Sequence, residues 1–408
     1  MAKKAQGSTK KTTAKSSSRT AASSRRVASG VPAETPIDRR LALVNGAGGF
    51  LGLNVVRELV RQGWHVRASD LPQVRIDHLS RDFGVETQPA DLLDLEQCRA
   101  LVNGVTHVFN LAGLFNFAAS REQLFNANVK ATEMMCRAAS GTKLERFVHV
   151  ATIGVYGRMG RRAADESWPH RPKNPYEATK EQGEAVAFHY ARTRGLPVVS
   201  LRPTVIYGPR SRYGVVTFLS AIAMLRFFGI RKAPAIPGGP KLSHVHVEDV
   251  ARALVHIATH GKVGEAYNCA DDTPQAWGDL ATFMAGEFGI EPADEYHVPD
   301  PVFHLLGRVA PYVPKSWLAG RQKQIDQQWQ KLVEAGVKDF LKPTLDMDFL
   351  GYLRSNHILD TGKLKNTGFR LNYPRTVDGL RQTIEWYREA GWLPRLDQFH
   401  QSGSRATA

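Results

Sequence analysis

The stretch that decides the fold is "LVNGAGGFLG", which runs from Leu43 to Gly52. Four of its last seven residues are glycine, although glycine loses more backbone freedom on folding than any other residue. An apolar run at 41–45 precedes the glycines, and residues 50–61 repeat apolar side chains at helical spacing. The stretch therefore predicts a strand that passes through a glycine-rich turn into a helix.

Three of these glycines have the spacing of a turn that binds a dinucleotide. Gly46 permits a tight turn, Gly49 lets the backbone approach a pyrophosphate, and Gly52 lets the helix pack against the strand. The helix N-terminus then offers free N–H groups and the positive end of its dipole to the phosphates. The strand before and the helix after supply the context that this motif requires.

Asp70 follows the next apolar run, "HVRAS", and lies 24 residues after Gly46. A carboxylate at this place accepts hydrogen bonds from the hydroxyls of an adenosine ribose and repels a 2′-phosphate. Asp70 therefore favours NAD over NADP, although the nearby Arg67 and Arg75 keep NADP as an alternative. A helix cap is the competing interpretation of Asp70, because aspartate is common in that role.

Two side chains suited to acid–base chemistry stand four residues apart in "NPYEATKEQGE", residues 174–184. On a helix this spacing puts Tyr176 and Lys180 on one face. A free tyrosine has a pKa near ~10, and a nearby ammonium group lowers that pKa because it stabilises the phenolate. The pair indicates a general acid/base centre, although a Tyr and a Lys at this spacing often have no joint role.

Short apolar runs alternate with helical patterns over the first half of the chain. The strand-like runs are "LALVN", "HVRAS", "GVETQP", "HVFNLA", "RFVHVA" and "PVVSLR", and helical patterns occupy residues 122–139 and 176–194. This alternation predicts an α/β fold, a Rossmann-type doubly wound parallel sheet with helices on both faces.

From about residue 209 the alternation weakens and Pro and Gly become frequent, which predicts a smaller C-terminal substrate-binding lobe. We expect a disordered basic tail at 1–38, an NAD-binding domain at 39–208, mainly the second lobe at 209–397, and a flexible end at 398–408. Residues 243–258 are expected to return to the first domain, because "HVEDVARALVHIA" again has helical periodicity.

The net charge of +15 is a weak argument for a nucleic-acid partner, because residues 1–36 alone carry +7. This Ser-, Ala- and Lys-rich tail has too few apolar side chains to form a core. A transit peptide and an electrostatic tether are the alternatives to a plain solvated tail. Cys98, Cys136 and Cys269 show no CxxC spacing, so we expect no metal site and a reducing, cytoplasmic location.

Several motifs, taken in order, resemble those of the extended short-chain dehydrogenases/reductases, which include NAD-dependent epimerases and 3β-hydroxysteroid dehydrogenases. They are Gly46-x-x-Gly49-Phe50-x-Gly52, Asp70, "ADLLD" (90–94), "NLAG" (110–113), "NVKAT" (128–132), "VATIGVYG" (150–157), Tyr176-x-x-x-Lys180, "RPTVIYGP" (202–209) and "HVEDVARA" (246–253). The set covers about residues 41–253, and "TGFRLNYPRTVDGLRQTIEWY" resembles the closing segment of the family. The resemblance implies an NAD-dependent dehydrogenase or epimerase.

The resemblance also implies residue roles. Thr152 would hydrogen-bond the substrate oxygen, Tyr176 would exchange its proton, and Lys180 would hold the nicotinamide ribose and tune the tyrosine. The residues expected to contact the cofactor are Gly46, Gly49, Phe50, Leu51, Gly52, Asp70, Asp91, Leu92, Leu111, Ala112, Gly113, Lys180 and Pro203. An ordinary strand-end residue is the other interpretation of Thr152, a cap that of Asp91, and Asn128 is expected only to tie its helix to a neighbour.

The substrate is inferred from two features. Dehydration is not expected, because nucleotide-sugar dehydratases of this family carry Thr-Asp-Glu where this chain has Thr152-Ile153-Gly154. The segment "NLAGLFNFAASREQLFNANVKAT" resembles the steroid-dehydrogenase branch, and apolar segments with basic ends at 214–230 and 301–321 suit a lipidic pocket or a bilayer surface. We expect a secondary alcohol and a ketone to be interconverted on a sterol-like or other apolar substrate.

Two other functions stay open: a nucleotide-sugar epimerase, and a non-catalytic NAD-binding scaffold or redox sensor. The expected partners are a small-molecule substrate and NAD, without specific nucleic acid. Peripheral contact with a membrane and a homodimer are further alternatives that the sequence leaves undecided.

Overall fold

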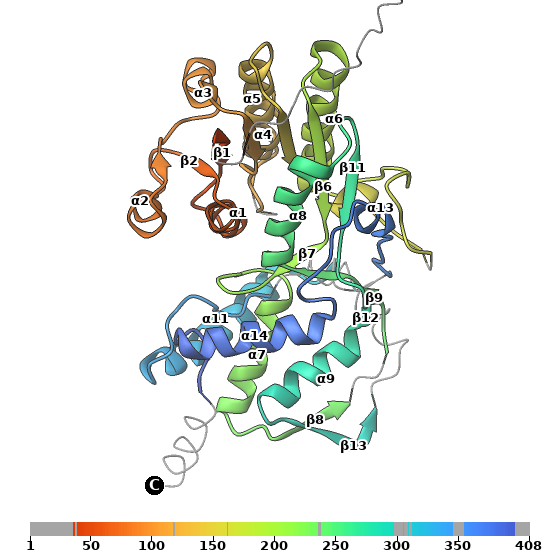
Figure 1. Cartoon of the computed structure of the whole chain (residues 1–408). Helices are drawn as coiled ribbons and strands as arrows, with labels where there is room; N and C mark the ends of the chain where they lie inside the picture. Colours follow the sequence, from red (N-terminus) through yellow and green to blue (C-terminus); the bar gives the residue numbers. More distant parts are fainter. Residues whose placement is uncertain are drawn as a thin grey trace, which may run out of the picture. The chain divides into compact units, whose positions relative to one another are not determined.

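The computed structural model describes residues 36, 39–116, 119–160, 162–235, 238–297, 305, 309, 312–345 and 355–395. Strands and helices alternate over the first half of the chain, as the apolar pattern predicts (Figure 1). In chain order they are β1 (Leu41–Asn45), α1 (Phe50–Arg61), β2 (His65–Ser69), α2 (Asp77–Phe83), β3 (Glu86–Thr87), α3 (Leu95–Val102), β4 (His107–Asn110), α4 (Arg121–Phe125), the π-helix η2 (Asn126–Lys130), α5 (Ala131–Ala139), β5 (Arg146–Val150), the 3₁₀ turn η3 (Ile153–Tyr156), α6 (Pro175–Arg194) and β6 (Val198–Pro203).

The main sheet has seven strands in the order β11-β6-β5-β4-β1-β2-β3, and β11 spans Ala266–Cys269. Every pairing between neighbouring strands of this sheet is parallel. Asn45, the last residue of β1, lies opposite Ser69 of β2 and Asn110 of β4. The strand order reverses between β1 and β4, and ligands bind at such a reversal beyond the carboxyl ends of the strands.

Helices cover both faces of the sheet, so its strands are apolar on both sides. On one face, α1 packs against α8 (Val247–His260), and their buried apolar side chains join those of the strands in one core. On the opposite face, α3 packs against α5 and α5 against α6. Each fully buried Val or Leu in these layers contributes about 1.5–3 kcal/mol relative to an exposed one.

A second hydrophobic core lies among helices from the later half of the chain. It is formed by α7 (Val215–Phe227), α9 (Trp277–Glu287), α11 (Lys315–Glu334) and α14 (Thr376–Glu389), and it buries the large rings of Trp277, Trp329 and Tyr387. The smaller elements of this half are β7 (Val205–Tyr207), β8 (Lys232–Ala235), β9 (Lys241–Leu242), β10 (His244–His246), β12 (Gln275–Ala276), β13 (Glu291–His297) and α13 (Gly362–Asn366).

The predicted fold class is confirmed, because all six expected strand runs lie in one parallel sheet between two helix layers. The sequence pattern missed the seventh strand, β11, whose four residues include the polar Asn268. Residues 122–139 are helical as expected but contain the π-helix η2. The basic tail, the C-terminal end and most of segment 301–314 lie outside the described residues. The division into domains remains a prediction.

No helix within the described ranges is both long and apolar enough to cross a membrane. Segment 214–230, which the sequence singled out, contains α7, which buries Val215, Val216, Leu219 and Ala223 in the second core.

Asp271 joins the end of the sheet to the second core. It lies just after β11, is 4% exposed, and accepts a hydrogen bond from the hydroxyl of Thr376, the first residue of α14. Burial raises the pKa of Asp271 to about 8. At intermediate pH the folded chain therefore holds a proton that the unfolded chain, with an aspartate pKa near ~4, has released.

We predict that the free energy of unfolding falls as the pH rises from about 4 to about 8, because ionising Asp271 in the folded chain is unfavourable. Asp271→Asn keeps an oxygen for Thr376 and stays neutral at every pH, so it should remove much of this slope. Thermal unfolding at several pH values measures it. Asp378→Asn is the control, because Arg375 lowers the pKa of this half-buried carboxylate, so it should leave the slope unchanged. An equal slope in Asp271→Asn and the parent chain would contradict the assignment.

Candidate functional site

The glycine-rich turn follows β1 and is so tight that side chains are excluded from it. Gly46 has φ 71°, and a Cβ there would lie 3.0 Å from the backbone N of Ala112. A Cβ on Gly52 would lie 2.0 Å from the carbonyl oxygen of Gly46. Glycine is therefore required at position 46, where the turn meets the backbone after β4, and at position 52, where α1 meets the turn.

The N-terminus of α1 faces this turn without a side-chain cap. Gly49 is the N-cap residue, and Phe50 and Leu51 form the start of the helix with no acidic residue in its first turn. The first N–H groups of a helix lack partners within the helix and carry partial positive charge. The turn and α1 together therefore form a cradle suited to an anionic group such as a pyrophosphate.

Asp70 lies at the end of β2 and is half-buried beside the turn. Its Oδ2 accepts a hydrogen bond from the backbone N–H of Gly48 at 2.9 Å, and its Oδ1 accepts one from the N–H of Leu71 at 2.8 Å. Asp70 is not the N-cap of α2, which is Ile76. The carboxylate is held at the rim of the cradle, where a ribose would meet it.

The ends of β1 and β4 are joined by a buried amide pair. The Asn45 amide donates to Asn110 Oδ1 at 2.8 Å, and Asn45 Oδ1 accepts the N–H groups of Leu111 and Ala112 at 2.7 and 2.9 Å. This arrangement fixes the backbone that follows β4 against the glycine-rich turn. Gly113 comes next, where a Cβ would lie 3.7 Å from the ammonium nitrogen of Lys180.

Asp91 and Leu92 lie in the loop after β3. Asp91 Oδ1 accepts the N–H of Leu93 at 2.9 Å, so this side chain turns back on its own loop. The N-cap of α3 is Asp94, not Asp91. Leu92 is buried in the core beneath α3 and α5. The contact of both residues with an adenine ring therefore remains a prediction.

Lys180 is the centre of the candidate catalytic group. It is buried on α6, and its Nζ donates to the carbonyl oxygen of Val150 at 2.6 Å, at the end of β5. Thr152 follows two residues later and caps η3, accepting the N–H of Gly154 at 3.2 Å. A Cβ on Gly154 would lie 2.8 Å from Glu177 Cγ, so η3 touches the first turn of α6 beside Tyr176. Thr152, Tyr176 and Lys180 are thus carried by segments in direct contact.

The electrostatics of this group differ from the sequence expectation. Burial raises the pKa of Tyr176 above its usual value, and the neighbouring Glu177 adds to the rise. Burial also lowers the pKa of Lys180, to about 8. The expected lowering of the tyrosine pKa by lysine is therefore outweighed, in the chain alone, by the loss of water around both groups.

Asn128 ties its helix to two neighbours, as expected from the sequence. It lies in the π-helix η2; its Oδ1 accepts the N–H of Leu114 at 2.8 Å and its amide donates to Thr179 Oγ1 at 3.0 Å. A Cβ on Gly183 would lie 2.3 Å from the Asn128 carbonyl oxygen, so α6 and η2 approach closely.

Pro203 ends β6 and lies opposite Cys269 of β11 in the sheet register. It is buried, and the chain continues directly into β7. The structure therefore places Pro203 at the carboxyl edge of the sheet, at the same edge as the other candidate residues, while its contact with a nicotinamide stays a prediction.

Aromatic rings lie beside the candidate acid/base. The ring of Phe115 packs edge-on against Tyr176, with centroids 5.0 Å apart, and against Tyr213, with centroids 5.3 Å apart. Phe115 is 43% exposed and Tyr213 58% exposed. Tyr213 precedes α7, so these rings extend from the site toward that helix.

The sequence interpretation missed several polar residues beneath the site. Asn110 also donates to His149 Nδ1 at 3.0 Å, and His149 is buried on β5 with its pKa well below the usual value because of burial and nearby Lys180. The signal was a polar residue ending an otherwise apolar strand, as in "LALVN" and "HVFN". No group of side chains suited to hold a metal ion occurs within the described ranges.

The residues fit a bound dinucleotide. No Cβ fits at Gly46 or Gly52, where the turn is tightest. The first turn of α1 carries no acidic side chain that would repel a phosphate. Gly46, Gly49, Phe50, Leu51 and Gly52 would hold the pyrophosphate and Asp70 the ribose, while Lys180 lies near the end of β4.

Comparison with known sequences gives matches over most of the chain. A family model described as "NAD dependent epimerase/dehydratase family" matches residues 42–270. A protein of Streptomyces niveus named dTDP-glucose 4,6-dehydratase is 27% identical over 388 residues, which cover 90% of this chain and 98% of that protein. A protein of Methylococcus capsulatus named sterol demethylase protein B is 31% identical over 229 residues, which cover 55% of this chain and 68% of that protein.

A solved structure has the same fold. The UDP-glucose 4-epimerase of Thermus thermophilus, solved in complex with NAD, superposes with a TM-score of 0.62 at 24% identity, and the match covers 86% of this chain and 99% of that chain.

We predict that Gly52→Ala weakens NAD binding by about tenfold or more, because overpacking of this kind costs about 1–3 kcal/mol and the added Cβ must displace the Gly46 carbonyl. Isothermal titration with NAD measures the loss. Gly286→Ala is the matched control, since a Cβ at this helical position in α9 would meet no atom within 4 Å. Equal affinities of the two variants would show that the tight turn does not form the cofactor site.

Proposed function

Because the chain belongs to the NAD-dependent epimerase/dehydratase family, and is thus an NAD-dependent enzyme of the extended short-chain dehydrogenase/reductase type, we propose that it interconverts a secondary alcohol and a ketone on an apolar substrate. A sterol or a similar hydroxylipid is the proposed substrate class. The residues proposed to act are Thr152, Tyr176 and Lys180.

The proposed chemistry divides among these three side chains. The Thr152 hydroxyl, which accepts from Gly154, would donate its own hydrogen to the substrate oxygen. The Tyr176 phenol would receive the alcohol proton on oxidation and return it on reduction. Oxidised NAD, when bound, supplies a hydride acceptor and a positive charge. Lys180, held by the Val150 carbonyl, would stabilise the phenolate during proton transfer.

The observation that carries the apolar substrate class is the pair of rings beside Tyr176. Phe115 contacts both Tyr176 and Tyr213, and all three rings are partly exposed. Aromatic surface next to the acid/base suits an apolar alcohol, since it gains from contact with a hydrocarbon skeleton. The likeness to a protein named for sterol demethylation supports the same class.

A nucleotide-sugar epimerase is the second candidate. The Streptomyces niveus relative, which aligns over 98% of its own length, is named for a nucleotide sugar. The Thermus thermophilus epimerase, which has the same fold, is also named for one. Against dehydration, the residues after Thr152 are Ile153 and Gly154, which supply neither of the acids expected in the dehydratases. Epimerisation needs no residue beyond the three named above.

The test of the substrate class is turnover with NAD, followed by absorbance of the reduced cofactor. Purified protein is offered 3-hydroxysteroids in one assay and a UDP-hexose in another, with the sugar products separated by chromatography. Oxidation of a hydroxysteroid supports the proposal. Conversion of the sugar without steroid oxidation would replace the proposal with the second candidate.

We predict that Tyr176→Phe lowers kcat by about 10²–10⁴-fold, the usual contribution of a general acid/base, and leaves the Kd for NAD within about twofold because the ring packing on Phe115 is kept. Tyr213→Phe, which also keeps its ring beside Phe115, is the control. A Tyr176→Phe enzyme with the kcat of the parent would disprove the role of the phenol.

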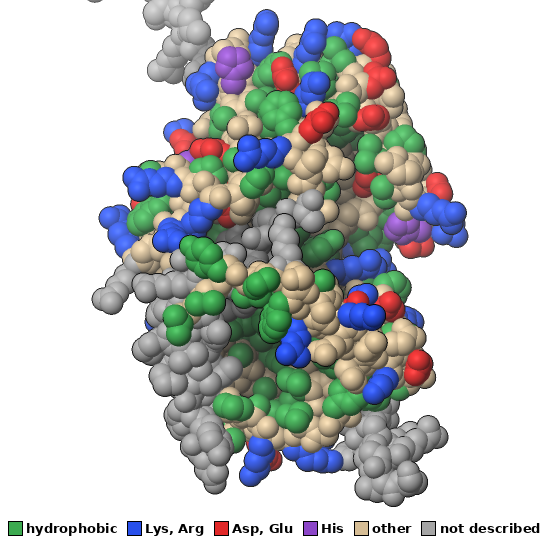
Figure 2. Space-filling view, turned by 180° about the vertical axis from the view of Figure 1, so that it is seen from behind, with side chains coloured by type: hydrophobic (Ala, Val, Ile, Leu, Met, Phe, Trp, Pro, Cys, Tyr) green, Lys and Arg blue, Asp and Glu red, His purple; other side chains and the backbone are tan. Residues whose placement is uncertain are grey.

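We also propose peripheral contact with an anionic membrane through the end of α7. Leu225, Phe228 and Ile230 are 47%, 43% and 41% exposed. The exposed Arg231 and Lys232 follow directly. Hydrophobic and basic side chains share the surface of the lower half of the molecule in Figure 2. Apolar side chains bordered by cations favour the interface of an anionic bilayer.

For this contact we predict that the double variant Phe228→Ser/Ile230→Ser binds phosphatidylserine-containing vesicles at least about tenfold more weakly, because each buried apolar side chain contributes about 1.5–3 kcal/mol. Co-sedimentation measures binding, with Val263→Ser as a control at a similarly exposed apolar residue. Failure of the parent chain to sediment with such vesicles, or equal loss in the control, would refute the contact.

A further inference from the structure

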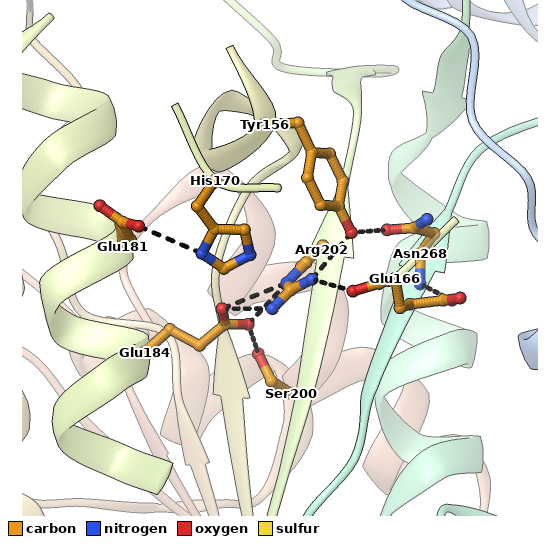
Figure 3. Close-up of polar contacts among 8 residues, drawn as sticks. All are labelled: Tyr156, Glu166, His170, Glu181, Glu184, Ser200, Arg202 and Asn268. Carbon is orange, nitrogen blue, oxygen red and sulfur yellow. Dashed lines mark hydrogen bonds and ion pairs between the residues drawn. The ribbon is translucent and has the colours of Figure 1, made fainter. Parts of the chain in front are cut away.

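Arg202 is the centre of a buried polar cluster near the carboxyl end of β6 (Figure 3). It lies on β6 directly before Pro203 and is 5% exposed. Its Nε and Nη2 donate to the two carboxylate oxygens of Glu184 at 2.9 and 2.8 Å. Its Nη1 donates to the Tyr156 hydroxyl at 2.8 Å. One guanidinium therefore joins β6, α6 and η3.

The remaining bonds anchor this cluster to the sheet. The Ser200 hydroxyl donates to Glu184 at 2.7 Å, from two residues earlier on β6. The Tyr156 hydroxyl donates onward to Asn268 Oδ1 at 2.7 Å, and the Asn268 backbone N–H donates to Glu166 Oε1 at 2.7 Å. Because Asn268 lies on β11, the cluster is bound at two neighbouring strands of the sheet.

The two partners of Arg202 stand next to the candidate catalytic residues. Glu184 is one helical turn beyond Lys180 on α6. Tyr156 ends the short turn η3 that Thr152 caps. A guanidinium fork is planar and binds a carboxylate in one geometry, so Arg202 transmits position and not only charge.

We propose that Arg202 is a positioning residue. Its hydrogen bonds hold Glu184 and Tyr156 together and so fix Lys180 of α6 against the turn that Thr152 caps. This inference rests on the proposed function, in which Thr152, Tyr176 and Lys180 act on one alcohol. Such positioning matters because a shift of about 1 Å between reacting groups can lower the reaction rate by about 10²-fold.

Removing either charge of the pair alone would leave the other buried and unpaired, which is strongly destabilising. Tyr156→Phe is therefore the decisive variant, since it removes the hydrogen bond between Arg202 and η3 but leaves the ion pair, and the guanidinium over the ring, in place. Tyr207→Phe is the matched control, because Tyr207 is equally buried and its hydroxyl donates to the Thr376 carbonyl, which is not part of the Arg202 cluster.

We expect Tyr156→Phe to lower kcat by about tenfold or more, with the Kd for NAD and the KM for the alcohol within about twofold of the parent. Tyr207→Phe should keep the kcat of the parent. An equal kcat for the two variants, when both melt at the same temperature, would overturn the proposal.

A second measurement needs no substrate. In protein labelled with ¹³C-lysine, the Lys180 signal is assigned with Lys180→Arg and titrated. Burial holds the pKa of Lys180 at about 8, and Glu184 raises it. The titratable groups that surround Lys180 are Tyr176, Glu177 and Glu184 on α6 and His149 on β5.

We expect Tyr156→Phe to shift the Lys180 signal more than Tyr207→Phe does. A Lys180 signal that moves no more in Tyr156→Phe than in Tyr207→Phe would overturn the positioning role. If the Lys180 signal changes as expected but the protein oxidises no alcohol, the positioning role is supported and only the proposed function is refuted.

Discussion

The architecture of the site depends on a contact in which backbone meets backbone without an intervening side chain. The Cα of Gly52 lies so near the carbonyl of Gly46 that no other residue fits there. This contact brings α1 down onto the turn after β1, so the first N–H groups of the helix lie at the carboxyl end of β1, where the strand order reverses. A larger residue would push the helix away and remove the electrostatic attraction that it offers to a phosphate.

Much of this could be predicted from the sequence because it depends on local pattern. Apolar runs separated by helical periodicity predicted six strands of the sheet, and the glycine spacing predicted the turn. The residues that align the strands could not be predicted in this way. Asn45 reaches Asn110 and Glu184 reaches Arg202 only after folding, across 65 and 18 residues of sequence. Polar side chains in buried strands indicate that partners exist, but they do not identify them.

The acid/base pair shows why spacing alone does not fix chemistry. Four residues of helix placed Tyr176 and Lys180 on one face, as predicted, but burial moved the two pKa values toward the neutral forms. Dry surroundings penalise the phenolate and the ammonium alike. In the proposed mechanism, a positive charge brought by the cofactor would favour the phenolate and would thereby couple proton transfer to cofactor binding. The fold fixes the positions of the two side chains, and the charge of the bound cofactor would offset the cost of forming a buried phenolate.

The path of the chain has a consequence for dissecting the molecule. The sheet is completed by β11, and one of its faces is covered by α8, yet both elements follow β7 and α7 in the sequence. A fragment that stops after β6 would leave that strand edge unpaired and the apolar face beneath α8 open to water. A fragment that keeps the sheet and its α8 cover must therefore extend through β11 and include β7 and α7, and any recombination with a relative must exchange these segments together with β1–β6.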